Sequence, residues 1–528
     1  MTPSFDLKEE ERDIFLKFYD FLDRTEVGEI IKRYENNNTK SGGRPNVNYY
    51  NLLATILYGF ATRRDTLREI EEACNYDIRF ISMMEQIRPD HSTISLFINK
   101  VVVPNEKEIF KLINNQLIKE MKVNLDDAFI DGTKFEANAN KYKFVWKPTT
   151  FHKRLTSTFF SILQENEICQ DFHYEEFVKS STIALSISRL SQEKDRFNEL
   201  KYTSLMKTLN SLLVKVLEYE EKESICGPNR NSYYKTDYDA TAMTLKTDYY
   251  SGLGTNTHAA YNTQILVSEG IVCSYLVSQE RTDIREFINV LDLFKWIYDR
   301  FPVNVCADAG YGSQKNYKYL KDNDIGNYVK HTSWEGNASG RNPDCYTLNE
   351  SNNTIVCLNG NIGVPVDIPN RHPKNKNGQF FKIEGCNSCE FRYYCKKYQK
   401  ILDEDFKIFE LSIEFLKEKQ KAERNLLSAK GIELRVNRSV QVEGVFGIVK
   451  QNAKYTRTRR RGLNRVSTEI MLTFLGHNIR KLFDFYRTNK RPNFWIAPKD
   501  LKDENFKKPS AKRLSKKGTK INNKIFKN

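Results

Sequence analysis

Three carboxylates in this chain, Asp131, Asp308 and Glu443, lie in sequence contexts that favour a chemical role. Asp131 follows Phe129 and Ile130 in an apolar run, where an ionised carboxylate is costly unless it is paired or binds a cation. Asp308 comes where a β-branched run ends in Ala-Gly-Tyr-Gly, and strand ends in α/β sheets commonly bind ligands. Three such carboxylates, brought together, would supply the oxygen ligands that two Mg²⁺ ions prefer for an in-line displacement at phosphorus. The acids therefore predict metal-dependent phosphoryl transfer, although each one alone is also compatible with a structural role.

Basic residues accompany the third carboxylate. Arg438 precedes Glu443, and Lys450 follows it by seven residues, nearly two helical turns, so that Lys450 and Glu443 share a helix face. Three apolar residues of this stretch are expected to pack the helix on a sheet: Val445, Phe446 and Val449. Four arginines follow closely and predict contacts to DNA phosphates, with a solvated basic loop as the alternative: Arg457, Arg459, Arg460 and Arg461.

A group of cysteines forms a second candidate site. Cys386, Cys389 and Cys395 have the spacing C-x2-C-x5-C, and Cys357 lies upstream. Two close cysteine pairs would be a strong zinc signal, whereas one pair with two looser cysteines is a moderate one. The spacing predicts a structural Zn²⁺ held by these four residues, with Cys345 as a substitute for Cys357. Reduced thiols without a metal are the alternative.

The composition narrows the class of partner. The 528 residues carry a formal net charge of +15, which favours a polyanion, with nucleic acid ahead of a membrane surface. Apolar residues make up 39% and aromatic residues 12%, enough for a real hydrophobic core. No apolar run approaches the length of a membrane helix, and the acidic start lacks a secretory signal. We therefore expect a cytoplasmic protein associated with the nucleoid.

Apolar periodicity predicts the elements that must position these residues. Helical spacing dominates up to about residue 122, with Asp90 as the cap of one helix. Alternation over Ala128–Ala139 predicts a strand that contains Asp131, and two apolar runs joined by Ser268-Glu269-Gly270 predict a hairpin. A helix follows the hairpin, then a short strand that ends at Asp308. A long amphipathic helix is predicted after Gly462.

The motifs occur in an order that resembles a known family. They are YGFATRRDTLREIEEACNYDIRF with RPDHSTIS, FIDGTKFEANANKYKFVWK, DYDATAM with AAYNTQ, VCADAGYGSQKNY, and RSVQVEGVFGIVKQNAKYTRTRRRGL. In this order the chain resembles insertion-sequence transposases of the DDE class, in the branch with a helical amino-terminal domain. The resemblance extends from about residue 40 to residue 485.

The resemblance implies an α/β fold with an RNase H-like mixed sheet. Asp131 would lie on its first strand, Asp308 after its fourth and Glu443 on its last helix, together holding two Mg²⁺ ions for which Mn²⁺ can substitute. Arg438 and Lys450 would be the catalytic basic companions of Glu443. Arg435 stands where relatives often have a tyrosine, which is a departure from the family pattern. Relatives often carry a similar cysteine group before the glutamate helix, which favours the zinc prediction.

The predicted organisation follows from the resemblance together with the periodicity. An all-helical N-terminal domain with a candidate DNA-binding role (1–122) precedes a core in three parts. The core segments are 123–146, 232–332 and 425–485, interrupted by a helical insertion (147–231) and a cysteine-containing insertion (333–424). Residues 486–528 are a basic tail that we expect to be disordered.

The predicted function is metal-dependent DNA strand cleavage and strand transfer at the ends of an insertion sequence. The expected partners are transposon-end and target DNA, together with a second copy of the chain in a homodimeric active complex. Two alternatives stay open at this point. One is a catalytically silent, transposase-derived DNA-binding protein, and the other is an RNase H-like nuclease without joining activity.

Overall fold

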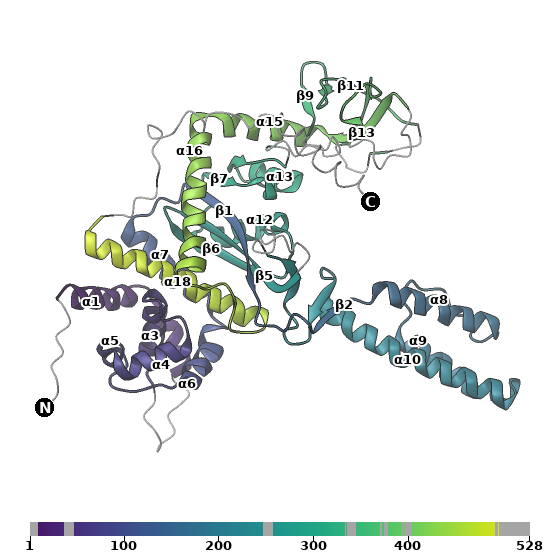
Figure 1. The fold of residues 1–528 in the computed structure, drawn as a ribbon, viewed down its shortest axis with the longest axis horizontal. Helices are drawn as coiled ribbons and strands as arrows, with labels where there is room; N and C mark the ends of the chain where they lie inside the picture. The colour runs from purple at the N-terminus through teal and green to yellow at the C-terminus, as the bar shows by residue number, and fades with distance from the viewer. Residues whose placement is uncertain are drawn as a thin grey trace, which may run out of the picture.

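Helices form the described part of the N-terminal region in the computed structural model (Figure 1). The structure describes residues 9–35, 47–245, 257–332, 334, 345–369, 372–373, 378–392, 395, 404–490 and 495. The helices are α1 (Glu9–Asp23), α2 (Val27–Glu35), α3 (Tyr49–Ala61), α4 (Leu67–Tyr76), α5 (Ile78–Met83), α6 (His91–Phe97), the π-helical η1 (Ile98–Val102) and α7 (Glu106–Met121). The predicted cap is confirmed, because the Asp90 carboxylate accepts a hydrogen bond from the backbone N–H of Thr93. Most of the predicted basic tail, 491–494 and 496–528, lies outside the described residues.

A mixed sheet forms the centre of the molecule and confirms the mixed α/β fold. Its strands are β1 (Asp127–Glu136), β4 (Thr241–Thr244), β5 (Thr257–Ser268), β6 (Ile271–Ser278), β7 (Asn304–Ala307) and β8 (Gly326–Val329). The order is β4-β5-β1-β7-β8, with β6 also paired to β5. β1 is antiparallel to β5 and parallel to β7, and β7 is parallel to β8. The predicted hairpin joins β5 and β6 through Glu269 and Gly270, whose φ angles of 47° and 75° suit a two-residue turn.

Helices cover the sheet and connect it to the N-terminal region. α12 (Phe287–Tyr298) and α13 (Gln314–Asp322) lie on one side, next to the short 3₁₀ turns η3 (Asp283–Arg285) and η4 (Ala309–Tyr311). A helical run begins with α16 (Ala429–Arg438) and continues through η6 (Ser439–Glu443), α17 (Gly444–Gly447) and η7 (Ile448–Asn452). The predicted long helix is α18 (Leu463–Thr488), which packs on α3, α7 and β6. As a result, the N-terminal helices and the sheet share one hydrophobic core.

The helical insertion forms an arm that projects from the body (Figure 1). A two-stranded ribbon of β2 (Phe144–Trp146) and β3 (Ser232–Tyr234) forms its base. The arm itself is α8 (Thr149–Glu165), α9 (Ser180–Gln192), η2 (Lys194–Arg196) and α10 (Glu199–Cys226). It has its own apolar cluster, which includes Phe159, Ile183, Leu190, Leu209 and Val216.

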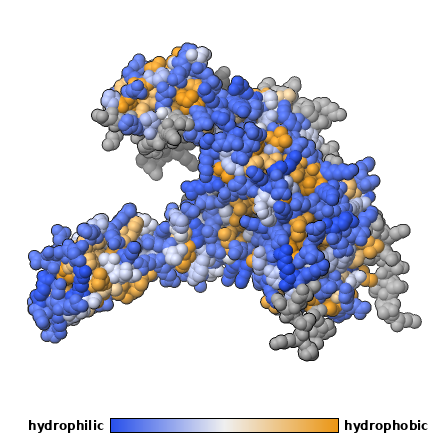
Figure 2. All heavy atoms as spheres, turned by 180° about the vertical axis from the view of Figure 1, so that it is seen from behind, coloured by the Kyte–Doolittle hydropathy of each residue, from blue (hydrophilic) through white to orange (hydrophobic). Residues whose placement is uncertain are grey.

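The cysteine-containing insertion forms a separate five-stranded antiparallel sheet, which the sequence did not predict. Its strands are β9 (Thr347–Asn349), β10 (Thr354–Val356), β11 (Ile362–Pro365), β12 (Gly378–Glu384) and β13 (Phe406–Ser412), followed by α15 (Ile413–Leu427). Three of these strands have only three or four residues, too short for a clear alternation. Figure 2 shows a wide recess between this β-rich module and the helical arm.

Candidate active site and arginine loop

The sheet brings Asp131 and Asp308 to neighbouring positions. β1 and β7 run parallel, and the last pair in their register is Ile130 with Ala307. Asp131 and Asp308 are the next residues after this pair, so they lie side by side where the β1–β7 pairing ends. The chain turns sharply after Asp308, because its carboxylate accepts a hydrogen bond of 2.9 Å from the Gly310 N–H. The structure therefore places two of the three predicted acids side by side.

Arg438 lies beside Asp131, in the helical run that also carries Glu443. Its Nη1 is 3.5 Å from Oδ2 of Asp131, and the two side chains are only 11% and 14% exposed. Among the described residues this Nη1 has no hydrogen-bond partner. Burial by itself lowers the pKa of Arg438, but the charges of Asp131, Cys306, Asp308 and Glu443 outweigh it and raise the pKa above its ordinary value. Asp131 is therefore the carboxylate beside this buried cation, and Asp308 and Glu443 act on its charge as well.

Glu443 belongs to a helix that is interrupted by π-helical turns. It is the last residue of η6, a π-helical segment that packs on β1 and β5. Gln441 fixes this segment, since its Oε1 accepts a hydrogen bond of 3.1 Å from the Gly270 N–H. Of the predicted apolar stripe, Val445 and Val449 are buried and Phe446 is half-buried. Glu443 itself is exposed, and single π turns occur frequently at functional sites.

Lys450 crosses from the helical run to β1. Its Nζ donates hydrogen bonds of 2.6 Å to Thr133 Oγ1 and 2.7 Å to the carbonyl of Lys134, and it lies 4.6 Å from the Phe135 ring centroid. Thr133 follows Asp131 by two residues, so both side chains project from the same face of β1. Lys450 is therefore anchored on the face of the strand that carries the catalytic candidate Asp131.

Arg435, which replaces the tyrosine expected from relatives, has a different setting. Its Nε donates a hydrogen bond of 3.1 Å to the carbonyl of Leu426, and its guanidinium lies 5.5 Å from the Trp334 ring centroid. Burial lowers the pKa of Arg435. In contrast to Arg438, its pKa is not shifted by any of the three acids.

The chemistry of the acids suits a hard divalent cation. Carboxylate oxygens are the ligands such ions prefer, and the raised pKa of Arg438 shows that this position favours positive charge. In the described part of the chain, however, no three His, Cys, Asp or Glu side chains are arranged closely enough to hold a metal ion. Asp131 instead lies 3.5 Å from the guanidinium of Arg438.

The predicted zinc ligands lie around a buried lysine. Four cysteines of the β-rich module are close enough to Lys407 to act on its charge: Cys345, Cys357, Cys386 and Cys395. Burial lowers the pKa of Lys407, the cysteines oppose this, and its Nζ donates a hydrogen bond of 3.0 Å to Tyr346 Oη. Cys345 joins this group in place of Cys389, the other member of the predicted set. Among the described side chains no group of three or more His, Cys, Asp or Glu residues is arranged to hold a metal ion, and the zinc site stays a prediction.

The four arginines after Glu443 divide into two pairs. Arg457 and Arg461 are exposed and donate hydrogen bonds to backbone carbonyls, Arg457 to Ala137 at 3.3 Å and Arg461 to Asn138 at 2.8 Å. Arg459 instead binds the N-terminal region, with both terminal nitrogens 3.0 Å from oxygens of Asp65. Arg460 also contacts this region, through a hydrogen bond of 3.1 Å to Asn99.

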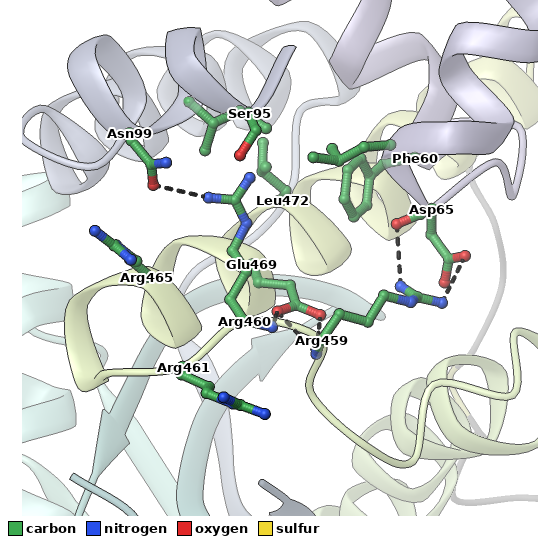
Figure 3. Close-up of a pocket in the computed structure, with 12 residues that line it drawn as sticks. Phe60, Asp65, Ser95, Asn99, Arg459, Arg460, Arg461, Arg465, Glu469 and Leu472 are labelled. Atoms are coloured by element: carbon green, nitrogen blue, oxygen red, sulfur yellow. Dashed lines mark hydrogen bonds and ion pairs between the residues drawn. The ribbon is translucent and has the colours of Figure 1, made fainter. Parts of the chain in front are cut away.

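These contacts form a seam between the N-terminal helices and the start of α18, defined here by Asp65, Asn99, Arg459, Arg460 and Glu469 (Figure 3). A cavity of about 240 Å³ lies in the seam, and Ser95 and Arg465 also line it. Glu469 accepts hydrogen bonds of 2.9 and 2.8 Å from the N–H groups of Arg459 and Arg460. Burial raises the pKa of Asp65 despite its pairing with Arg459. The seam partners Asp65, Asn99 and Glu469 were not predicted, because no local pattern connects them with the arginines.

Comparisons with known proteins add two family matches. A family model described as "Transposase DDE domain" matches residues 356–483, which include Arg438, Glu443 and Lys450. A second, described as "Transposase domain (DUF772)", matches residues 4–100 in the N-terminal helical region. No curated protein and no solved structure matches significantly. Within the described ranges, no helix is long and apolar enough to cross a membrane.

Proposed function

Because this chain is a DDE transposase, we propose that Asp131, Asp308 and Glu443 hold the divalent metal ions of its polynucleotidyl transfer reaction. One observation carries the proposal. Asp131 of β1 and Asp308 after β7 lie side by side where the β1–β7 pairing ends, and Arg438, in the helical run that carries Glu443, lies 3.5 Å from Asp131. Only the fold brings them together, because long stretches of chain separate them in the sequence.

We also propose that the central sheet is an RNase H-like core. The order of the elements along the chain supports this proposal. When the short edge strand β4 is left aside, Asp131 lies on the first core strand and Asp308 follows the fourth, β7. Glu443 lies on a helical run that packs against β1 and β7. These are the positions that the family resemblance implies for the acids.

The reaction at this site is metal-dependent phosphoryl transfer on DNA. DDE transposases use divalent metal ions, and we propose two Mg²⁺ ions here, with Mn²⁺ as a substitute. When bound, such ions activate an attacking water or DNA 3′-hydroxyl and stabilise the leaving oxygen. Asp131 and Asp308 would supply oxygen ligands from the place where the β1–β7 pairing ends, and Glu443 would supply another from the helix.

The basic residues would act on the phosphate of the cleaved strand. Arg438 keeps its charge in a buried position beside the acids, where a cation stabilises developing negative charge more than it would in water. Lys450 extends from η7 to the same face of β1. We further propose that the exposed Arg457 and Arg461 contact DNA phosphates, and that Arg459 and Arg460 mainly join the two parts of the protein. A homodimeric active complex is a proposal that rests on the family resemblance alone.

Alanine substitutions test the acid assignment directly. Asp131→Ala, Asp308→Ala and Glu443→Ala are each expected to abolish Mg²⁺-dependent strand cleavage and to leave binding of the element's ends unchanged. Asp322→Ala is the matched control, since Asp322 is an exposed acid of the same region paired with Lys318. Retained cleavage in any of the three variants would remove that residue from the site. Joined donor–target products from the wild-type protein would separate a transposase from a nuclease that only cleaves.

A further inference from the structure

A buried polar network lies directly behind the strand that carries Asp131. Gly132, the next residue, is paired across the sheet with Gln264 of β5. Successive residues of a strand point to opposite faces, so this network lies on the face opposite the Asp131 side chain. A Cβ at Gly132 would lie only 2.7 Å from Oε1 of Gln264 and 2.9 Å from Oδ1 of Asp283. The glycine therefore lets the network pack against the backbone beside Asp131.

Gln264 is the centre of this network. Its Nε2 donates hydrogen bonds to Oδ1 of Asp283 at 2.8 Å and to Oδ1 of Asn262 at 3.0 Å. Asn262 also donates to Asp283, at 2.9 Å. On its other side, Gln264 accepts a hydrogen bond from the hydroxyl of Tyr311. Asn262 and Gln264 are fully buried and Tyr311 is almost so, and two acceptors at Nε2 fix the orientation of the amide.

Tyr311 connects the network to the turn that carries Asp308. It ends η4, the turn that begins directly after Asp308. Burial raises the pKa of Tyr311 well above its ordinary value, and Asp131, Asp283 and Asp308 raise it further, so the hydroxyl keeps its proton. Asn316 holds the backbone of the turn, since its Nδ2 donates to the carbonyl of Tyr311 at 2.8 Å. Gln264 therefore links the backbone beside Asp131 with the turn after Asp308.

We propose that Gln264 and Tyr311 are positioning residues that set the separation of the Asp131 and Asp308 carboxylates for the metal ions. This proposal rests on the function proposed for the two acids. A buried polar network has to be fully satisfied to be tolerated, and an apolar side chain could fill the same space. In this network each member has a hydrogen-bond partner. The hydrogen bonds connect the segment that carries Asp131 with the segment that carries Asp308, which are no longer paired with each other beyond Ala307. Groups that orient metal ligands from behind typically affect metal affinity by about 10- to 100-fold.

The test measures metal binding separately from cleavage. Mn²⁺ binding to the full chain is followed by electron paramagnetic resonance, and the Mg²⁺ concentration for half-maximal strand cleavage is measured in parallel. Gln264→Met keeps the size of the side chain and removes its hydrogen bonds, whereas Tyr311→Phe removes one hydroxyl only. Both variants are expected to bind Mn²⁺ about 10-fold more weakly and to need correspondingly more Mg²⁺, with unchanged affinity for the element's ends.

A matched control separates positioning from general loss of stability. Tyr317 is as buried as Tyr311 and donates to the backbone carbonyl of Val329 at 2.9 Å, outside the network. Tyr317→Phe is expected to keep the wild-type affinity for Mn²⁺. Wild-type Mn²⁺ affinity in Tyr311→Phe, or an equal loss in Tyr317→Phe, would overturn the proposal, even if Gln264→Met failed to fold. If Asp131→Ala also bound Mn²⁺ like the wild type, the proposed acid site would fail; if only Asp131→Ala lost binding, the positioning role alone would fail.

Discussion

The acid site and the seam each combine buried or half-buried charges with an exposed one, Glu443 and Arg459 respectively, but their charge balance differs. At the acid site three carboxylates act on the guanidinium of Arg438, and Lys450 lies on the same face of β1, so the carboxylates outnumber the cations by one. At the seam the charges are matched: Asp65 pairs with Arg459, and Glu469 accepts from the backbone of Arg459 and Arg460. Both regions use arginines from the same part of the chain.

This difference separates a ligand site from a structural contact. Buried charge is costly unless it is compensated, so an excess of carboxylates favours a cation from solution. A matched set needs no ligand and instead holds two parts of the protein together. On this basis we expect substitutions at the acid site to change metal binding and catalysis, and substitutions at the seam to change stability.

The largest effect is expected for Arg438→Met. Loss of the guanidinium removes a cation beside the reacting phosphate, and strand cleavage should fall by about 100- to 1,000-fold. Mn²⁺ should bind at least as tightly as in the wild type, because the three carboxylates lose a competing positive charge. Single-turnover cleavage and Mn²⁺ titration measure the two effects. Arg435→Met, in the same helix but facing Trp334, is the control that should retain cleavage. Weaker Mn²⁺ binding in Arg438→Met would contradict the excess of negative charge at this site.

The next effect concerns the stability of α18 where it packs beneath the N-terminal helices. Burial lowers the pKa of His477 from 6.5 to about 4, and its Nε2 hydrogen-bonds the carbonyl of Gly270 at 3.1 Å. The unfolded chain therefore takes up a proton below pH 6.5 that the folded protein takes up only near pH 4. Stability is lost as the pH falls through this window, by up to about 3 kcal/mol.

His477→Gln keeps a hydrogen-bond donor and removes the titration. Compared with the wild type, this variant should lose less unfolding free energy between pH 7 and about 4.5, as measured by denaturant unfolding. The contribution of the other histidines cancels in the comparison. Parallel pH profiles for the two proteins would show that His477 is not held neutral in the fold.

Local sequence context was sufficient for the elements and the residues whose signal lies in short segments. The N-terminal helices, the cap at Asp90 and the β5–β6 hairpin follow from periodicity and turn chemistry, and the structure confirms them. Asp131 was identified because a carboxylate in an apolar run is costly, and Asp308 because it stands where a strand ends in a glycine-rich turn. Their adjacency could not be derived from the sequence, since it depends on the register between β1 and β7.

Features that depend on distant partners were missed. Asp65 and Asn99 lie more than 350 residues before the arginines they contact, so no local pattern indicates the seam. The zinc site stays a prediction, whereas the effect of four cysteines on Lys407 of β13 could not be expected from the cysteine spacing. The short strands of the β-rich module show no clear alternation of apolar and polar residues. The π-helical turns around Glu443 were also missed, because they leave the predicted apolar stripe of the helix intact.

The smallest effect separates the two pairs of arginines. Arg461 is exposed and binds only the carbonyl of Asn138 among the contacts described, so its charge is available to a DNA phosphate. Arg461→Ala should weaken DNA binding several-fold and reduce the slope of log affinity against log salt by about one. Arg459→Ala removes the ion pair with Asp65 and should leave that slope unchanged. Because the Arg459 side chain is 40% exposed, the loss of this pair should cost at most about 1 kcal/mol of stability. DNA-binding titrations between about 50 and 200 mM salt measure the slopes. An equal reduction of the slope in Arg461→Ala and Arg459→Ala would mean that Arg459 of the seam is as available to DNA as Arg461. The distinction between the two pairs of arginines would then not hold.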